Sequence, residues 1–232
     1  MIAIANMKRL LVIWVILLIF SIPAVAGVGF DAGLYAYEQG DFTTALQEWT
    51  PLAEQGDRKS QAWLGVMYNH GKGVPKDNKE ALKWYRKAAS QEDGLAQTML
   101  GYMYYDGEGV PKDYKEAFKW YRKAASQEAS PAQFQLGQMY HLGLGVPKDN
   151  KEALEWYRKA ASNGLAEAQC MLGFMYYNGE GVAKDYVLAY MWFNLASAQD
   201  YDKAKDSIKI LEEKMTPDQI EEAQKLSREF NR

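Results

Sequence analysis

Few residues in this sequence could do chemistry, and their spacing keeps them apart. The two histidines, His70 and His141, fall at different positions of the repeat described below, and neither belongs to an H-E-x-x-H metal motif. The single cysteine, Cys170, has no neighbouring histidine to activate it, so we expect it to be a small buried apolar residue. The sequence therefore predicts no metal site and no reactive thiol.

The acidic and hydroxyl side chains give no stronger catalytic signal. The pairs Glu212-Glu213 and Glu221-Glu222 lie in a charged C-terminal stretch, where solvated carboxylates are the usual outcome. Folding could still bring two carboxylates together for glycosidase chemistry. No serine is followed by a lysine three residues later, as the Ser-x-x-Lys motif of serine β-lactamases requires. We expect no catalytic residue, no cofactor and no enzymatic activity.

A glycine-rich loop is the third place where chemistry could occur. "GKGVPKD" begins at residue 71, and related heptapeptides begin at 107, 143 and 179. Its Gly-x-Gly resembles a phosphate-binding loop, but no strand precedes it and no Gly-Lys-Ser/Thr follows. Instead, Gly71 is predicted to end one helix in a left-handed conformation. Asp77 is predicted to cap the next helix, with Glu80 completing a capping box. The loop is therefore a predicted helix–turn–helix hinge.

This hinge recurs because the chain is a tandem repeat. Four units align without gaps, at 60–95, 96–131, 132–167 and 168–203. A fixed 36-residue period predicts stacked pairs of helices, that is, an all-α solenoid. The flanking segments depart from the pattern as terminal units must: 27–59 is a degenerate N-terminal capping repeat, and 204–232 is a C-terminal helical cap.

The first helix of each unit divides into two faces when residues are placed at intervals of about 100°. Five columns are identical in all four units, and their first members are Gln61, Leu64, Gly65, Met67 and Tyr68. Five columns vary freely, and their first members are Ala62, Trp63, Val66, Asn69 and His70. The identical half is predicted to be the packing face, with Gly65 allowing a neighbouring helix to approach closely. The varying half is predicted to be unnecessary for stacking.

The varying half is rich in aromatic residues and methionine, which are residue types that interfaces favour. We expect it to bind a protein or peptide through the residues Trp63, Val66, Met99, Tyr102, Gln135, Gln138, Met171 and Phe174. His70, Asp106, Leu142 and Asn178 continue the same face. The alternative is that part of this face packs within the superhelix or against the next first helix.

The second helix of each unit carries an apolar stripe and a charged outer face. In the first unit that face contains Lys79, Lys83, Arg86 and Lys87, which suggests anion binding. Acidic residues such as Glu80 are interspersed, so we favour a solvated convex surface.

The first 26 residues have the features of a secretory signal peptide. Lys8 and Arg9 precede an apolar run that is too short to span a membrane, and Ala24-Val25-Ala26 has the form of a cleavage site. We expect cleavage after Ala26 and a periplasmic or secreted protein without membrane insertion, the alternative being an uncleaved anchor. Removal of Lys8 and Arg9 changes the formal charge from −3 to −5, which argues against nucleic acid as a partner.

The unit motif resembles that of the Sel-one-like repeat family, a relative of the tetratricopeptide repeats. The shared pattern is A-x-x-L-G-x-M-Y-x-x-G-x-G-V-x-x-D…A-x-x-W-Y-x-x-A-A, and it extends through 60–197. The resemblance implies a right-handed superhelix of antiparallel helix pairs with the first helices on the concave side. It also implies an adaptor or scaffold for protein assemblies. The Helicobacter cysteine-rich proteins share the repeat and suggest an alternative, a protein that binds or hydrolyses peptidoglycan or β-lactams. Their repeats each contain a cysteine pair, whereas this chain has only Cys170.

Overall fold

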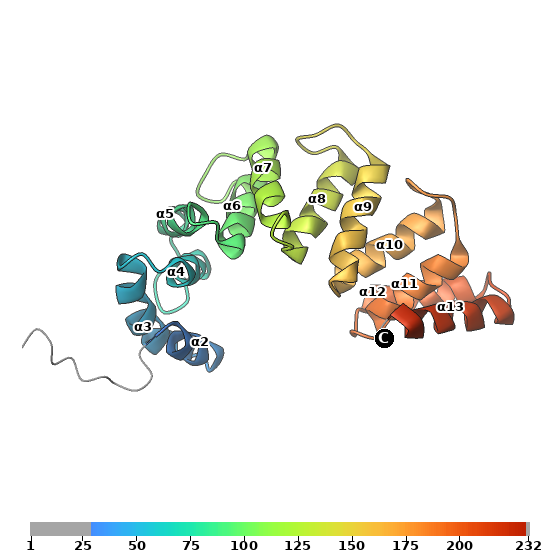
Figure 1. The fold of residues 1–232 in the computed structure, drawn as a ribbon, viewed down its shortest axis with the longest axis horizontal. Helices are drawn as coiled ribbons and strands as arrows, with labels where there is room; N and C mark the ends of the chain where they lie inside the picture. The colour runs from blue at the N-terminus through green and yellow to red at the C-terminus, as the bar shows by residue number, and fades with distance from the viewer. Residues whose placement is uncertain (1–28, 231–232) are drawn as a thin grey trace, which may run out of the picture.

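The computed structural model describes residues 29–230, and within that range all regular structure is helical. Twelve helices follow one another along an arc, with α2 at one end and α13 at the other (Figure 1). The leading pair consists of α2 (Phe30–Glu38) and α3 (Phe42–Glu54). The predicted signal peptide lies outside the described residues.

Each of the four repeat units contributes one antiparallel helix pair. The first helices are α4 (Arg58–His70), α6 (Gly94–Asp106), α8 (Ser130–Leu142) and α10 (Ala166–Asn178). The second helices are α5 (Asn78–Ala89), α7 (Tyr114–Ala125), α9 (Asn150–Ser162) and α11 (Tyr186–Ser197). Each pair packs most extensively within its unit, and each second helix then packs on the first helix of the next unit. The chain is therefore the predicted all-α solenoid.

The glycine column of the first helices allows the two helices of a unit to approach closely. A Cβ atom on Gly65 would lie 2.5 Å from the ring of Tyr85, and one on Gly137 would lie 2.6 Å from the ring of Tyr157. The rings occupy the space that a side chain would need, and Tyr85 and Tyr157 are fully buried. The identity of this column is thus explained by packing within the unit, as predicted.

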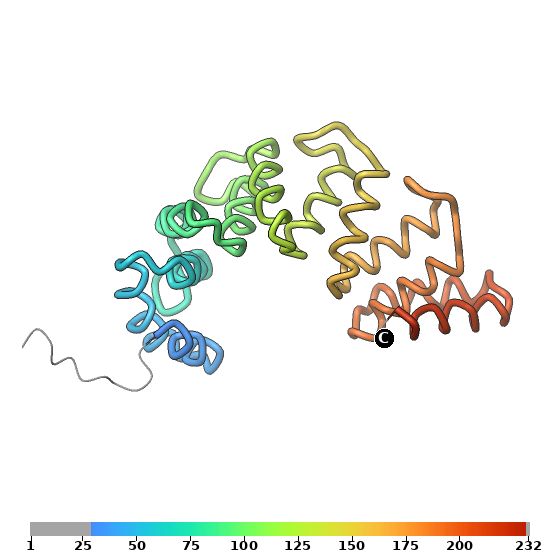
Figure 2. Tube along the Cα trace, in the orientation of Figure 1, coloured from blue at the N-terminus to red at the C-terminus, as the bar shows by residue number. Residues whose placement is uncertain are grey.

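The hinge loop has two glycines because it makes two different contacts. Gly71 ends α4 at φ 66°, in the left-handed region predicted for it. A Cβ atom on Gly145, a second glycine of the motif, would lie 2.6 Å from the backbone of Tyr114 in the preceding unit. The loop, which is visible as the long connection between α8 and α9 in Figure 2, therefore rests on the start of the preceding second helix.

The predicted N-cap is confirmed, but the capping box is wrong. Asp77 Oδ1 accepts hydrogen bonds from the backbone N–H groups of Lys79 and Glu80. The backbone N–H of Asp77 donates to the carbonyl oxygen of Tyr68, at 2.9 Å. Because the loop closure already satisfies this donor, the Glu80 carboxylate pairs with Lys83 instead.

A buried amide pair explains the glutamine column. Gln61 is 5 % exposed, and its side-chain oxygen accepts a hydrogen bond from Gln91 Nε2 at 2.9 Å. Gln199 donates to Gln169 in the same way, also at 2.9 Å. Each pair connects the start of a first helix to the residues that follow the second helix, so it closes the unit at the end opposite the hinge.

The C-terminal pair, α12 (Asp202–Glu212) and α13 (Pro217–Phe230), closes the array on α11. Met191 and Leu195 of α11 replace the charged residues of earlier units, lysine in every case except Glu155, and are buried. α13 covers this apolar face: Ser227 Oγ donates to the carbonyl oxygen of Met191, and the Phe230 ring lies 5.1 Å from that of Trp192. The basic outer face is therefore absent where another helix takes its place.

Candidate binding surface

The residues that could have supported thiol or histidine chemistry lie apart. His70 is exposed at the end of α4, whereas His141 Nε2 lies 2.8 Å from Glu180 Oε2 in the next hinge loop. Cys170 is 2 % exposed, and burial raises the pKa of its thiol to about 11, so the neutral form predominates near pH 7. Between residues 29 and 230 no three metal-ligating side chains are placed to hold an ion.

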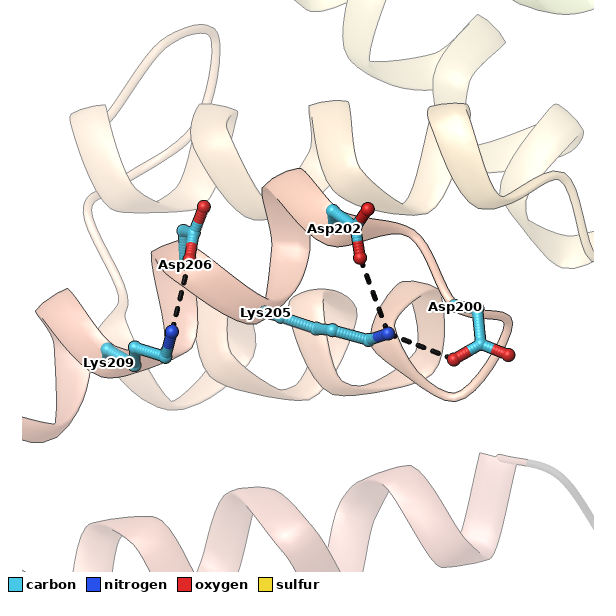
Figure 3. Close-up of polar contacts among 5 residues, drawn as sticks. All are labelled: Asp200, Asp202, Lys205, Asp206 and Lys209. Atoms are coloured by element: carbon cyan, nitrogen blue, oxygen red, sulfur yellow. Dashed lines mark hydrogen bonds and ion pairs between the residues drawn. The ribbon is translucent and has the colours of Figure 1, made fainter.

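The acidic residues near the C-terminus are paired or solvated. Lys205 Nζ lies 2.9 Å from Asp200 and 3.4 Å from Asp202, and Lys209 lies 3.2 Å from Asp206 (Figure 3). The hydrogen bond from Lys205 lowers the pKa of Asp200 below its ordinary value. These pairs give α12 a charged outer face and have no geometry for acid–base catalysis.

The predicted binding residue Trp63 is largely part of the core. Its ring lies 5.0 Å from that of Tyr37 and 5.3 Å from that of Trp49, both in the N-terminal pair. Trp49 is fully buried and donates from Nε1 to the carbonyl oxygen of Phe30. Trp63 therefore connects the first repeat unit to its cap.

The column that begins with Val66 is also used in packing. Val66 itself is buried, at 9 % exposure. Tyr102 stands edge-on against the ring of Tyr121 at 5.5 Å, and Phe174 against that of Phe193 at 5.0 Å. These rings remain half-buried, so they contribute one edge to the surface and the rest to the core.

The other predicted residues, Met99, Gln135, Gln138 and Met171, are half-buried on the same side of the first helices. Gln135 Nε2 donates to the Tyr102 hydroxyl at 3.2 Å, which connects two consecutive first helices.

The prediction that the whole varying half of the first helices is unnecessary for stacking is wrong. In the column of Ala62, the side chains of Ala62, Thr98 and Cys170 are 1 %, 5 % and 2 % exposed. Asn69 is 6 % exposed and donates to Glu108 of the next hinge loop at 3.2 Å. Part of the varying half is therefore buried, and only the remainder is accessible.

The first helices α4, α6 and α8 lie on the inner side of the curvature. α4 packs against α6, and α6 against α8, whereas no two consecutive second helices contact each other as extensively in the described chain. The accessible parts of Met99, Tyr102, Gln135, Gln138, Leu142, Met171 and Phe174 form a band that we call the first-helix surface. Leu142 is 60 % exposed, and Phe174 lines a small apolar hollow with Tyr177 and Ile210.

Sequence reasoning missed contacts that join neighbouring units. Arg86, which was predicted to face solvent, donates to the Tyr104 hydroxyl of the next unit at 3.1 Å. Arg158 makes the equivalent bond to Tyr176 at 3.2 Å. The signal was present in the sequence, because this arginine recurs in three units and a tyrosine always follows it 18 residues later.

The comparisons with known proteins agree with this architecture. The family model of the Sel1 repeat matches 58–93, 94–128, 130–165 and 166–201, which is most of the chain. The chain belongs to the Sel1 repeat family. Proteins of this family are in general scaffolds for protein interactions and mostly not enzymes. No curated protein matches the sequence.

Two solved structures are similar over most of the Sel1 repeat chain. The uropathogenic Escherichia coli protective antigen c5321, which displays an SLR fold, is 40% identical, with a TM-score of 0.79 over 87% of this chain. That match covers only 44% of c5321, so this chain spans less than half of its length. A Sel1 repeat protein from Oxalobacter formigenes is 36% identical, with a TM-score of 0.73 over 77% of this chain and 73% of its own. The Pseudomonas aeruginosa immunity protein Pa5087 shares the fold, with a TM-score of 0.53 and 22% identity over 86% of this chain and 79% of its own.

Proposed function

We propose that this Sel1 repeat protein is an exported scaffold that holds a protein segment against its first-helix surface. The observation that carries the proposal is the near absence of charge on that side. Among the 13 residues of each of α6, α8 and α10, the only Asp, Glu, His, Lys or Arg are Asp106, His141 and Glu167. A partly accessible surface with so few charged residues supports protein binding.

The shape of the surface favours an elongated partner. The first helices repeat at regular intervals along the inner side of the arc, so successive units offer similar contacts in a row. A helix or an extended segment could then place apolar side chains against Met99, Leu142 and Met171 in turn. Aromatic edges from Tyr102 and Phe174 would add contact area without a large loss of side-chain entropy.

Photo-crosslinking in cells that naturally make the protein tests this proposal. A benzoylphenylalanine placed at Gln138, Leu142 or Met171 is expected to capture a discrete partner protein, and one at Lys79, at the start of α5 on the second-helix side, is not. The substitutions Leu142→Asp and Met171→Asp should abolish capture from Gln138 while leaving the helical circular dichroism unchanged. Capture that is equal from both sides, or unaffected by the two aspartates, would contradict the proposal.

Export is a separate part of the proposal, and it rests on the leader sequence. The basic residues Lys8 and Arg9, the apolar run and the Ala24-Val25-Ala26 site support it. None of the described helices is long and apolar enough to cross a bilayer. Fractionation followed by N-terminal sequencing should find a chain that begins at Gly27 outside the cytoplasm, and a chain that retains Lys8 in the cytoplasm would contradict export.

A further inference from the structure

A second surface, on the side of the second helices, is hollowed and is independent of the proposed function. A hollow of about 630 Å³ lies between α5 and α7, and one of about 570 Å³ lies between α7 and α9. A third, of about 530 Å³, lies on α7 itself, and Ser126 lines all three. They adjoin as one trough, which we call the second-helix trough, defined by Arg86, Trp120, Lys123, Ser126, Trp156 and Lys159.

The trough is confined to the middle of the array. Trp120 and Trp156 occupy equivalent positions in consecutive units and are half-buried. The equivalent Trp84 is buried, at 8 % exposure, and Trp192 is 5 % exposed because α13 covers it. Two adjacent units thus present the same indole at the surface, while the units on either side do not.

The trough has a net positive charge, because six basic side chains line it against the four glutamates Glu92, Glu116, Glu128 and Glu155. Lys123 Nζ lies 4.4 Å from the centre of the Trp120 ring, and Lys159 Nζ lies 4.1 Å from that of Trp156. α5 and α7 each carry four basic residues against one acidic residue. The whole chain has a formal charge of −3, so this side differs in sign from the rest of the molecule.

The largest excess of negative charge lies at the N-terminal end of the described chain. Residues 29–57 include six acidic residues and no lysine or arginine. On α2, Asp31, Tyr35 and Glu38 follow one another at i, i+4 and i+7 and therefore share one stripe. Gly33 and Ala36 form the buried face, and the stripe is on the opposite side, with Tyr35 68 % exposed.

We propose that the α2 stripe of a second copy of this chain docks in the second-helix trough. Tyr35 packs against the indole of Trp120 or Trp156, and the carboxylates of Asp31 and Glu38 face Lys123 and Lys159. A lysine that already lies over an indole ring has lost part of its hydration before the partner binds. Every copy carries both the stripe and the trough, so a reciprocal pair of contacts closes a two-fold dimer.

Sedimentation velocity of the mature chain tests the dimer. At about 50 mM salt the protein should associate reversibly, and raising the salt to about 500 mM should weaken association, because exposed ion pairs are screened. The variants Lys123→Glu/Lys159→Glu and Asp31→Lys/Glu38→Lys should each weaken association at least about tenfold. Lys79→Glu, on α5 but outside the trough, is the matched control and should leave it unchanged.

Mixing the two charge-reversed variants is the decisive step. Each variant alone places like charges at both contacts, whereas the mixed pair has one wild-type contact and one contact with inverted signs, so a heterodimer should form. Circular dichroism establishes that both variants are folded. A wild-type chain that stays monomeric at low salt, or association that ignores these substitutions, would overturn the proposal. Binding of fluorescent polyglutamate at the trough by a chain that does not self-associate would also overturn the proposal. The occupant of the trough would then be an acidic segment of another protein.

Discussion

Two glutamates hold a left-handed backbone conformation that two other units of the same chain fill with glycine and the fourth unit fills with Asp200. Glu92 and Glu128 follow the second helices α5 and α7 at φ 61°. The equivalent position is Gly56 in the cap, at φ 99°, and Gly164 in the third unit, at φ 84°. We therefore predict that Glu92→Gly and Glu128→Gly stabilise the protein.

The magnitude follows from the backbone alone. A left-handed conformation costs an L-residue about 1–2 kcal/mol, and glycine loses about 0.5–1 kcal/mol more entropy on folding. Both glutamates are exposed, and their side chains make no hydrogen bond or ion pair with another described residue, so truncation removes no such contact. The net gain is about 1 kcal/mol for each substitution, or a rise in Tm of about 2–4 °C for a chain of this size.

Thermal and urea unfolding followed by circular dichroism measures the effect. Glu92→Ala is the matched control: alanine removes the charge but still suffers the left-handed backbone, so it should not stabilise. The reverse substitution Gly164→Glu should destabilise by a similar amount, because a Cβ there meets no atom within 4 Å and only the backbone is strained. If alanine stabilises as much as glycine, or if Gly164→Glu is neutral, backbone strain is not the cause.

Three further predictions concern buried polar groups. The Tyr121 hydroxyl is buried without a hydrogen-bond partner, and the fourth unit has Phe193 at this position. Tyr121→Phe should therefore leave the midpoint of urea unfolding unchanged or raise it. A loss of stability above about 1 kcal/mol would mean that the hydroxyl has a hydrogen-bond partner. Burial raises the pKa of Asp93, which caps α6 by accepting a hydrogen bond from the Ala96 N–H. A raised carboxyl pKa lowers the stability of the folded chain as pH rises through it, so Asp93→Asn should stabilise the protein at pH 7 and lose that advantage in acid. A gain in stability that does not depend on pH would refute this. Because burial raises the pKa of Cys170 to about 11, a thiol reagent at pH 8 should label the folded chain far more slowly than the urea-unfolded chain, and equal rates would place the thiol at the surface.

Features that depend on a few neighbouring residues were predictable from the sequence. The left-handed Gly71, the Asp77 cap and the close contact at Gly65 each follow from local geometry and were identified because four units solve the same packing problem. Contacts between units leave only an indirect signal, such as the recurring 18-residue spacing from Arg86 to Tyr104, and cannot be assigned from one helix alone. Arg86 reaches Tyr104 only because the superhelix places the next first helix beside it, and one helical wheel contains no such information.

The predicted binding residues show what variation in a column means. Trp63 packs against the rings of Trp49 and Tyr37 in the cap, and later units have the smaller ring of tyrosine or phenylalanine at the position of Trp49. Phe174 meets Phe193, and the same position in the second unit, Tyr102, meets Tyr121. A column that varies among the units can therefore be packed against different partners or be free of packing. The exposed fraction of its side chains is needed to distinguish the two cases.

The hinge loop that rests on the preceding unit has a consequence for how such chains can change in length. Each joint is made from the same parts, a glycine turn against the backbone at the start of a helix, as for Gly109 against Asn78 and Gly145 against Tyr114. Excision of one whole period would bring Gly145 to the place of Gly109 and recreate the joint. The length of the arc can therefore change by recombination without redesign of this joint, while the surface offered to partners changes separately by point substitution.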